Sequence, residues 1–478
     1  MTELKISKVL AKKVWDKLNT TAVPIVGPQD FIDIDSTIST LNENIDNRVY
    51  FPGNIHGYLG LEKRHGVARF IPIINHIDMA VYYQLCGEIG DHAISDLEGV
   101  FGGWQVVPTP QARTDIAKLP KDEQVAKLYS QEYFSETFSS ASWFQNYVSF
   151  TDLLKELIST GMYGDYVGIT DIANFYDSID IGKLIRKLRQ RTQNLEQHLS
   201  LLEIYLSFWN RRLSGYQASN RGIPQEIISD GSRNLSHAYL HNFDDAMIAY
   251  SEEEGIKYVR WADDILFFAS SRGKIERALY KASQFLLQDG LNLSAPKTNI
   301  MPRSEFEKYR CLGLLDAISK KDDAEFLKQA VLVEGRVDKK LPVKIDTAIR
   351  AIIGHLIRFP SLRSPQNTSF VYKTVSKNPE LLSNLNSQQL LGLCAMSPTP
   401  EKTLNSIKGY SLRRDLIAPR AGVLKLLRDE NRGLNTLGIN KGKQIRIISE
   451  IERNSKESEI ISSFCAPAAL AELNYSLR

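Results

Sequence analysis

Hydrophobic positions in the first part of the chain predict short strands and helices. An apolar run at residues 67–74 is typical of a strand. Residues 76–87 follow with apolar positions at helical spacing and Asp78 near their start, which predicts an amphipathic helix. An earlier helix is predicted by the spacing of Val9, Leu10, Val14 and Trp15.

The middle of the chain carries the clearest alternation between strand and helix patterns. Residues 166–171 are rich in β-branched side chains and predict a strand. Residues 257–262 and 265–269 predict two more strands, which flank Asp263 and Asp264. This arrangement predicts a β-hairpin with two acidic residues at its turn. Helical spacing predicts helices at 177–191, a basic segment, and at 272–287.

Beyond about residue 325 the pattern is almost wholly helical. Apolar pairs recur at spacings of three and four in the segments 345–357, 381–393, 412–427 and 445–461. Proline and glycine separate these segments, which favours a helical bundle or a loose solenoid, without a period clean enough to assign a repeat family. The patterns together divide the chain into an N-terminal region (1–150), a central region (151–320) and a helical region (325–478).

Composition limits the domain number and the class of protein but does not indicate a function. The length of 478 residues suggests two or three domains, and 43% apolar with 24% charged residues is ordinary for globular proteins. The net charge of +3 neither demands nor excludes a nucleic-acid partner. Residues 401–453 hold 12 Lys or Arg against 6 Asp or Glu, typical either of a solvated helical surface or of a nucleic-acid patch.

The cysteines and apolar runs bear on location. Four cysteines lie far apart without a CxxC pair, which argues against a zinc cluster or a disulfide framework and suits a reducing cytosol. The longest apolar runs fall short of a membrane span, and the N-terminus lacks the features of a secretory signal. We therefore expect a cytoplasmic protein with no membrane partner.

The paired acids Asp263 and Asp264 are the strongest candidates for chemistry. Acids at a turn are usually solvated, but these two lie between strongly apolar strands, where their repulsion is costly unless a cation compensates it. Asp171 ends another predicted strand, which could lie beside the hairpin. Three carboxylates suit two hard cations, and such a pair would activate a 3′-hydroxyl and stabilise a leaving pyrophosphate.

Five segments in this region resemble motifs A to E of reverse transcriptases, in the family order. They are TDIANFYDSI (170–179), RGIPQ (221–225), WADD (261–264), LNLSAPKT (291–298) and CLGL (311–314). An upstream segment, KRHGVARFIP (63–72), resembles the part of the fingers that clasps a triphosphate. The resemblance implies an α+β right-hand polymerase of fingers and palm, followed by an all-α, HEAT-like C-terminal domain, with part of the fingers at about 181–230.

The resemblance implies roles for individual residues. Two Mg²⁺ ions, for which Mn²⁺ may substitute, would bind at Asp171, Ile172, Asp263 and Asp264, and Lys297 would act on the triphosphate and protonate pyrophosphate. The nucleotide would contact Arg69, Lys63, Gln225 and Tyr176, the last as a steric gate that favours deoxynucleotides. A short motif E hairpin with Leu312 and Gly313 would grip the primer.

Two residues depart from the family pattern. Glu226 follows Gln225 where the family has glycine, and Trp261 replaces the tyrosine of motif C. With the helical tail and the missing accessory domains, the chain is similar to the abortive-infection group of bacterial reverse transcriptases, which act in phage defence. That group implies dNTPs as substrates, a homo-oligomer, and single-stranded DNA made either without a template and attached to a protein hydroxyl, or with a noncoding RNA.

Two other interpretations stay open. One is a conventional RNA-templated reverse transcriptase of a retron or an intron-type element. The other is a catalytically silent scaffold that binds nucleic acid, which the departures at Glu226 and Trp261 suggest and the three retained acids oppose.

Overall fold

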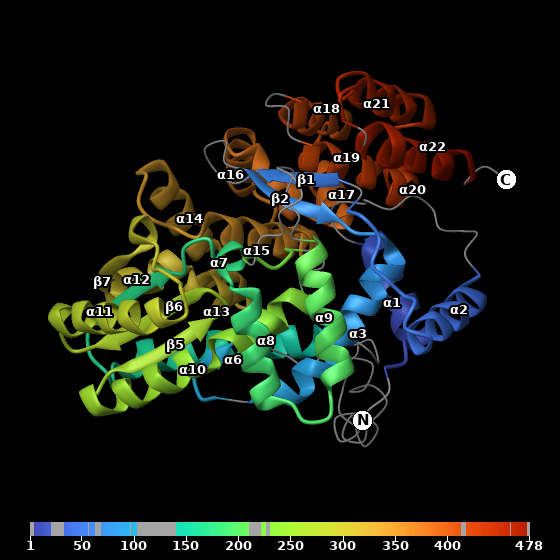
Figure 1. Cartoon of the computed structure of the whole chain (residues 1–478). Coiled ribbons are helices and arrows are strands. Elements are labelled where there is room, and N and C mark those ends of the chain that lie inside the picture. The colour runs from blue at the N-terminus through green and yellow to red at the C-terminus, as the bar shows by residue number, and fades with distance from the viewer. Residues whose placement is uncertain are drawn as a thin grey trace, which may run out of the picture. The chain divides into compact units, whose positions relative to one another are not determined.

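The structure is a computed structural model (Figure 1). It describes residues 4–20, 33–55, 57–62, 68–95, 97–102, 140–209, 221–225, 230–412, 417–458 and 460–475. The chain divides into two compact units. The first contains residues 1–16, 33–56 and 74–306, and the second contains residues 17–32, 57–73 and 307–478. Among the described segments, no helix is both long enough and apolar enough to cross a membrane.

A five-stranded sheet forms the centre of the first unit, in the strand order β3-β5-β6-β4-β7. Strand β3 pairs parallel with β5, and the other neighbours are antiparallel. The neighbouring inner strands β4 and β6 consist mostly of buried residues, because helices cover the sheet. The strands are β3 (Val100–Phe101), β4 (Tyr166–Asp171), β5 (Lys257–Trp261), β6 (Asp264–Ala269) and β7 (Asn299–Pro302).

Helices α10 (Asp230–Glu254) and α11 (Arg272–Gln288) connect the sheet to the rest of this unit. Helix α11 packs on β4 and β6, and α10 packs on β5, α11, α8 and α3. The other helices described in this unit are α2 (Ile34–Asp46), α3 (His76–Ala93), α6 (Ser140–Thr160), α7 (Phe175–Ser178), α8 (Ile181–Arg191) and α9 (Glu196–Trp209). Helix α1 (Lys8–Thr20) contains residues of both units. A mostly antiparallel sheet covered by helices is an α+β arrangement, as predicted.

The second unit combines a hairpin with the C-terminal helices. Strands β1 (Gly57–Glu62) and β2 (Ala68–Ile73) pair antiparallel, and β1 packs on α19 (Ile417–Asp429). The other α-helices are α13 (Leu312–Lys320), α14 (Asp323–Asp338), α15 (Ile345–Arg358), α16 (Pro365–Lys377), α17 (Ser387–Ala395), α18 (Pro400–Leu412), α20 (Asn431–Thr436), α21 (Lys441–Arg453) and α22 (Ala466–Tyr475). Helix α12 (Arg303–Arg310) spans the boundary between the units.

Most predicted elements are confirmed. The strands predicted at 166–171, 257–262 and 265–269 and the helices predicted to begin at residues 76, 272 and 345 agree with the structure to within a few residues, except that α3 extends to Ala93. The helical character beyond residue 325 is also confirmed. The predicted motif E hairpin at 311–314 is wrong, because residues Leu312–Lys320 form helix α13. Leu312 is buried there and α13 packs on α14, so the apolar residues of this segment serve helix packing.

Candidate active site

Pairing of β4 with β6 brings the three acidic residues to one end of the sheet. Asp171, the last residue of β4, lies opposite Asp264, the first residue of β6, in the antiparallel register. Asp263 immediately precedes Asp264, and its carbonyl oxygen accepts a 3.2 Å hydrogen bond from the amide of Ile172. Directly opposed residues in such a pair have Cα atoms only about 4.5–5.5 Å apart, so the carboxylates share one small region.

The turn before the acids has an unusual backbone. Ala262 has a φ of +53°, in the left-handed region that a non-glycine residue rarely occupies. Its amide donates to the carbonyl of Phe101 at 3.1 Å, so strand β3 supports the turn. Gly102 comes directly after Phe101 in the chain and has a φ of +108°. A Cβ at this residue would lie 2.6 Å from the Ala262 nitrogen. The close approach of β3 therefore requires glycine at residue 102.

Trp261, the last residue of β5, packs against aromatic side chains. Its ring lies against Phe150 at 5.2 Å and Tyr147 at 5.4 Å, measured between ring centroids, and Phe101 is 6.4 Å away. Aromatic pairs at these separations add to the burial of apolar area. The replacement of tyrosine by tryptophan in motif C is thus matched by aromatic partners from α6 and β3.

Like charges dominate the electrostatics of the site. Burial, followed by the charges of Asp264 and Asp171, raises the pKa of Asp263 to about 6, and Lys297 opposes this rise. The Lys297 ammonium lies 2.5 Å from Asp171 Oδ2. Lys297 ends a 3-10 turn (Ala295–Lys297), which is tied to β4 by a 2.7 Å bond between the Thr298 and Thr170 hydroxyls. Lys297 therefore lies at the acids, and its role on the triphosphate stays a prediction.

The donor set fits hard divalent cations. Carboxylate oxygens are the ligands that Mg²⁺ and Mn²⁺ prefer. Two opposed acids and a third with a raised pKa hold a negative charge that a cation would compensate. In the described part of the chain, no three Asp, Glu, His or Cys side chains are already grouped as a metal site. At present Lys297 supplies the positive charge at Asp171.

The backbone brings Tyr176 and Gln225 into one neighbourhood. Residues 221–225 run beside the segment after β4, since the Gly222 amide donates to the Ile179 carbonyl at 2.7 Å and the Ile223 amide to the Tyr176 carbonyl at 2.9 Å. Tyr176 is half-buried on α7. Gln225 is also half-buried, and its buried Oε1 accepts no hydrogen bond from any described residue. Glu226 lies outside the described residues.

Three other predicted site residues lie in the described part of the second unit. Arg69 is exposed on β2, opposite Leu61 in the hairpin register. Leu312 and Gly313 begin helix α13. Lys63 lies outside the described residues. The structure thus groups Asp171, Asp263, Asp264 and Lys297. It places Gln225 two residues after Ile223, whose amide bonds to the Tyr176 carbonyl.

Basic residues of α8 are largely neutralised by partners within the first unit. Lys187 pairs with Asp289 at 2.7 Å, and Arg189 pairs with Glu196 at 2.7 Å. Lys183 donates to the carbonyl of Gln288 at 2.6 Å, and Arg191 contacts His241 at 2.8 Å. The basic run of this helix therefore reflects packing against neighbouring elements.

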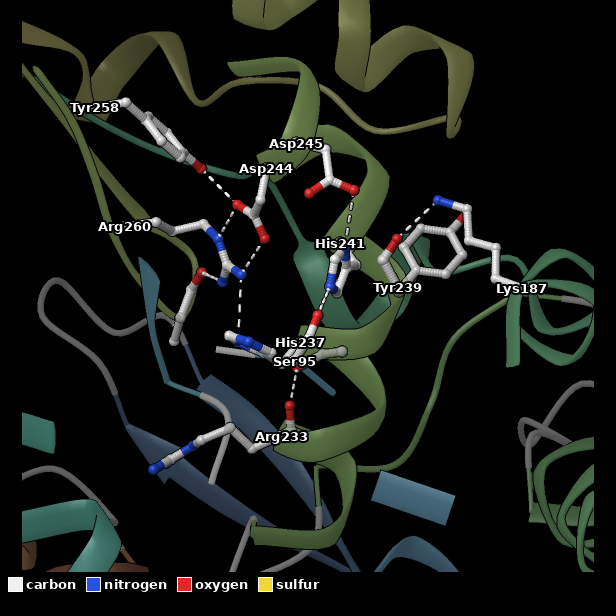
Figure 2. Close-up of polar contacts among 12 residues, drawn as sticks. Ser95, Lys187, Arg233, His237, Tyr239, His241, Asp244, Asp245, Tyr258 and Arg260 are labelled. Atoms are coloured by element: carbon white, nitrogen blue, oxygen red, sulfur yellow. Dashed lines mark hydrogen bonds and ion pairs between the residues drawn. The ribbon is translucent and has the colours of Figure 1, made fainter. Parts of the chain in front are cut away.

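Sequence reasoning missed one group beside the acids. Arg260 of β5 and Asp244 of α10 form a fully buried ion pair (Figure 2), two residues before the turn. The available indication was an arginine inside an otherwise apolar strand. A buried charge requires a partner, but the pattern does not show that the partner is on α10.

Part of the chain matches a known protein family. The family model for "Reverse transcriptase (RNA-dependent DNA polymerase)" matches residues 124–327. The retron Ec83 reverse transcriptase of Escherichia coli is 26% identical over 119 residues, which is 25% of this chain. The match spans only 36% of that relative's length.

Solved telomerase structures show weak overall similarity. Telomerase from Candida albicans, in complex with a fragment of telomeric RNA, has a TM-score of 0.35 and 9% identity, covering 80% of this chain and 67% of its own. Apo telomerase from Candida tropicalis has a TM-score of 0.32 and 11% identity, covering 92% and 71%. Since the family match contains all four grouped residues, the chain carries a reverse transcriptase domain within residues 124–327.

Proposed function

We propose that the protein is an RNA-directed DNA polymerase of the reverse transcriptase type that transfers nucleotides from dNTPs at Asp171, Asp263 and Asp264. The register of β4 and β6, which sets Asp171 opposite Asp264 beside Asp263, is the observation that carries the proposal. A hydroxyl oxygen attacks the α-phosphorus of the dNTP, the new O–P bond forms, and pyrophosphate leaves. The hydroxyl proton is released in the same step.

The residues divide this work. Asp171, Ile172, Asp263 and Asp264 are proposed to hold two Mg²⁺ ions, or Mn²⁺ in their place, which would polarise the attacking hydroxyl and offset charge on the leaving group. Lys297 is proposed to donate a proton to the departing pyrophosphate, and its position at Asp171 supports this role. Tyr176 would exclude a 2′-hydroxyl, and Gln225 would contact the nucleotide through its amide. Arg69 and Lys63 would bind the triphosphate. Of the two residues predicted to grip the primer, Gly313 is half-buried and is proposed to contact it, whereas Leu312 is buried in helix packing.

The biological setting is proposed to be antiphage defence in the bacterial cytoplasm. The helical region that follows the polymerase domain supports the abortive-infection type, in which a homo-oligomer makes single-stranded DNA, either attached to a protein hydroxyl or with a noncoding RNA. The similarity to a retron reverse transcriptase favours the alternative of RNA-templated copying. The four cysteines are buried free thiols, as suits a reducing compartment.

Incorporation of labelled dNTPs tests the proposal. We expect the wild type to incorporate label with Mg²⁺ or Mn²⁺, and the Asp263→Asn/Asp264→Asn double variant to lose it by several orders of magnitude. Asp165→Asn is the matched control, because Asp165 is an exposed acid just before β4. Retained synthesis by a folded double variant would reject the site, and a wild type inactive with every template and metal would favour the silent scaffold.

The same assay separates the two settings. Label that appears without added template or primer, shifts on protease digestion and survives RNase pretreatment of the enzyme indicates protein-primed, untemplated synthesis. Label that requires RNA and an annealed primer indicates conventional reverse transcription and excludes the abortive-infection assignment.

A further inference from the structure

A buried guanidinium bonds to the turn that precedes Asp263 and Asp264. Arg260 is in β5, with 0% of its surface exposed, and it is three residues before Asp263. Its partner Asp244, on α10, is 1% exposed. A charge removed from water to this extent is unfavourable unless every donor and acceptor is satisfied. The contacts of Arg260 therefore indicate what the pair does.

One side of the guanidinium binds Asp244 through two hydrogen bonds. Arg260 Nε donates to Asp244 Oδ1 at 2.7 Å, and Nη2 donates to Oδ2 at 2.6 Å (Figure 2). The Tyr258 hydroxyl donates to the same Oδ1 at 2.7 Å. His237 Nδ1 lies 3.3 Å from Nη2, and burial followed by the Arg260 charge holds the pKa of His237 well below its usual range. His237 is thus a neutral acceptor, and the orientation of the guanidinium plane is fixed from α10.

The other side of the guanidinium reaches the turn. Arg260 Nη1 donates to the carbonyl oxygen of Ala262 at 2.7 Å. Ala262 is the residue with the left-handed backbone, and its amide is held by Phe101. Both polar groups of this peptide segment therefore have fixed partners. The direction in which the chain enters Asp263 depends on the carbonyl bond as well as on the strand pairing.

We propose that Arg260, oriented by Asp244, is a positioning residue that sets the geometry of Asp263 and Asp264 through the Ala262 carbonyl. The inference rests on the proposed function and deepens it. Arginine is required because its planar fork binds a carboxylate with two donors and still has a third for the carbonyl. Lysine has a single nitrogen, which cannot hold both partners in this geometry.

A purely structural ion pair is the competing explanation. Buried ion pairs can often be replaced by apolar groups of similar volume without loss of stability. A charge-free replacement therefore separates the two roles. The double variant Arg260→Met/Asp244→Asn removes both charges, and the Asn side chain keeps an oxygen that can accept from the Tyr258 hydroxyl. The turn itself loses a single hydrogen bond, the one from Arg260 to the Ala262 carbonyl.

The test measures kcat, KM for dNTP, and the Mg²⁺ concentration for half-maximal activity, each per folded molecule. We expect the double variant and Arg260→Lys to lower kcat or metal affinity by roughly 10- to 100-fold, as outer-shell changes do, with KM for dNTP within about threefold of wild type. Tyr258→Phe is the control. It removes a bond to Asp244 but none to the turn, so all three quantities should stay within about threefold.

Wild-type kcat and Mg²⁺ dependence in the folded double variant would overturn the inference. If the double variant does not fold, Arg260→Lys is compared with the wild type in kcat and Mg²⁺ dependence. This comparison still tests the inference, because lysine keeps a positive charge for Asp244 and loses the bond to the Ala262 carbonyl. Asp263→Asn is assayed alongside. A wild type without activity rejects the proposed function, whereas an active wild type with unaffected Arg260 variants rejects this inference alone.

Discussion

At the scale of single residues, the ionised carboxylate of Asp263 destabilises the folded, metal-free protein. It is partly buried and faces two other carboxylates, so its ionised form is disfavoured in the folded protein. Positions of this kind exchange stability for function. The pKa of about 6 implies that folding favours the protonated acid. Its contribution to stability is therefore present at acidic pH and is lost as the pH rises through about 6.

Replacing Asp263 by Asn should stabilise the metal-free protein. Above pH 6 we expect the free energy of unfolding in EDTA to rise by roughly 1–3 kcal/mol, since the variant has no charge to repel Asp171 and Asp264. Urea unfolding between pH 4 and 8 measures the effect, which should shrink toward pH 4.

The matched control for this measurement is Asp165→Asn. Asp165 is exposed and paired with Arg303, so the free energy of unfolding should change by only about 0.5 kcal/mol. An Asp263→Asn variant less stable than wild type at pH 8 would show that the carboxylate is not repelled in the folded state.

The residues that could be predicted from sequence share a local cause. Asp263 and Asp264 are adjacent, and the apolar strands beside them made their burial evident. The contact of Lys297 with Asp171 spans 126 positions, and the resemblance implied only that Lys297 acts on the triphosphate, so this pairing was not predicted. The Arg260–Asp244 pair was missed because it depends on how α10 packs on β5, which the pattern of either segment alone does not contain.

At the scale of elements, the short strand β3 supports the acidic turn. Two backbone hydrogen bonds join this segment to β5 and the turn after it. The Arg260 amide donates to the Gly99 carbonyl at 2.9 Å, and the Ala262 amide donates to the Phe101 carbonyl at 3.1 Å. Such contacts make the turn sensitive to any side chain added at Gly102. The sheet offers a second glycine of similar strain at the opposite end of β6, which permits a matched comparison.

Gly102→Ala should impair catalysis more than Gly164→Ala. Both glycines have φ above +100°, and an added Cβ would lie 2.6 Å from Ala262 nitrogen at residue 102 and 2.3 Å from Ser270 Cα at residue 164. Both variants should lose stability to a similar degree, on the order of 1–3 kcal/mol. Only Gly102→Ala should lose dNTP incorporation, by tenfold or more per folded molecule. Equal losses of activity would argue that β3 has no particular role at the turn.

Elements were predictable where local pattern and packing agree. The strand at 166–171 has the predicted bounds, because β-branched residues fit a strand that is covered by helices. Residues 311–314 were expected to form a hairpin by resemblance, but the segment continues with apolar residues at helical spacing, and it forms α13 against α14. Here the helical packing of the following residues outweighs the motif.

At the scale of the whole molecule, each unit is built from segments distant in sequence. The hairpin of residues 57–73 belongs with residues 307–478, although 233 residues separate the two segments in the chain. Hydrophobic periodicity reports which face of an element is buried but not against which partner. This explains why the elements could be predicted while their grouping into units could not.

The central claim is that Asp171, Asp263 and Asp264 form one metal site for nucleotidyl transfer. Binding of Mn²⁺, followed by electron paramagnetic resonance in the presence of a non-hydrolysable dNTP analogue, tests it most directly, because the measurement requires neither template nor primer. The account predicts two bound Mn²⁺ ions per chain in the wild type, unchanged in Asp165→Asn, and a loss of this binding in both Asp171→Asn and Asp263→Asn. Binding that is equally strong in the wild type and in these two variants would contradict the account.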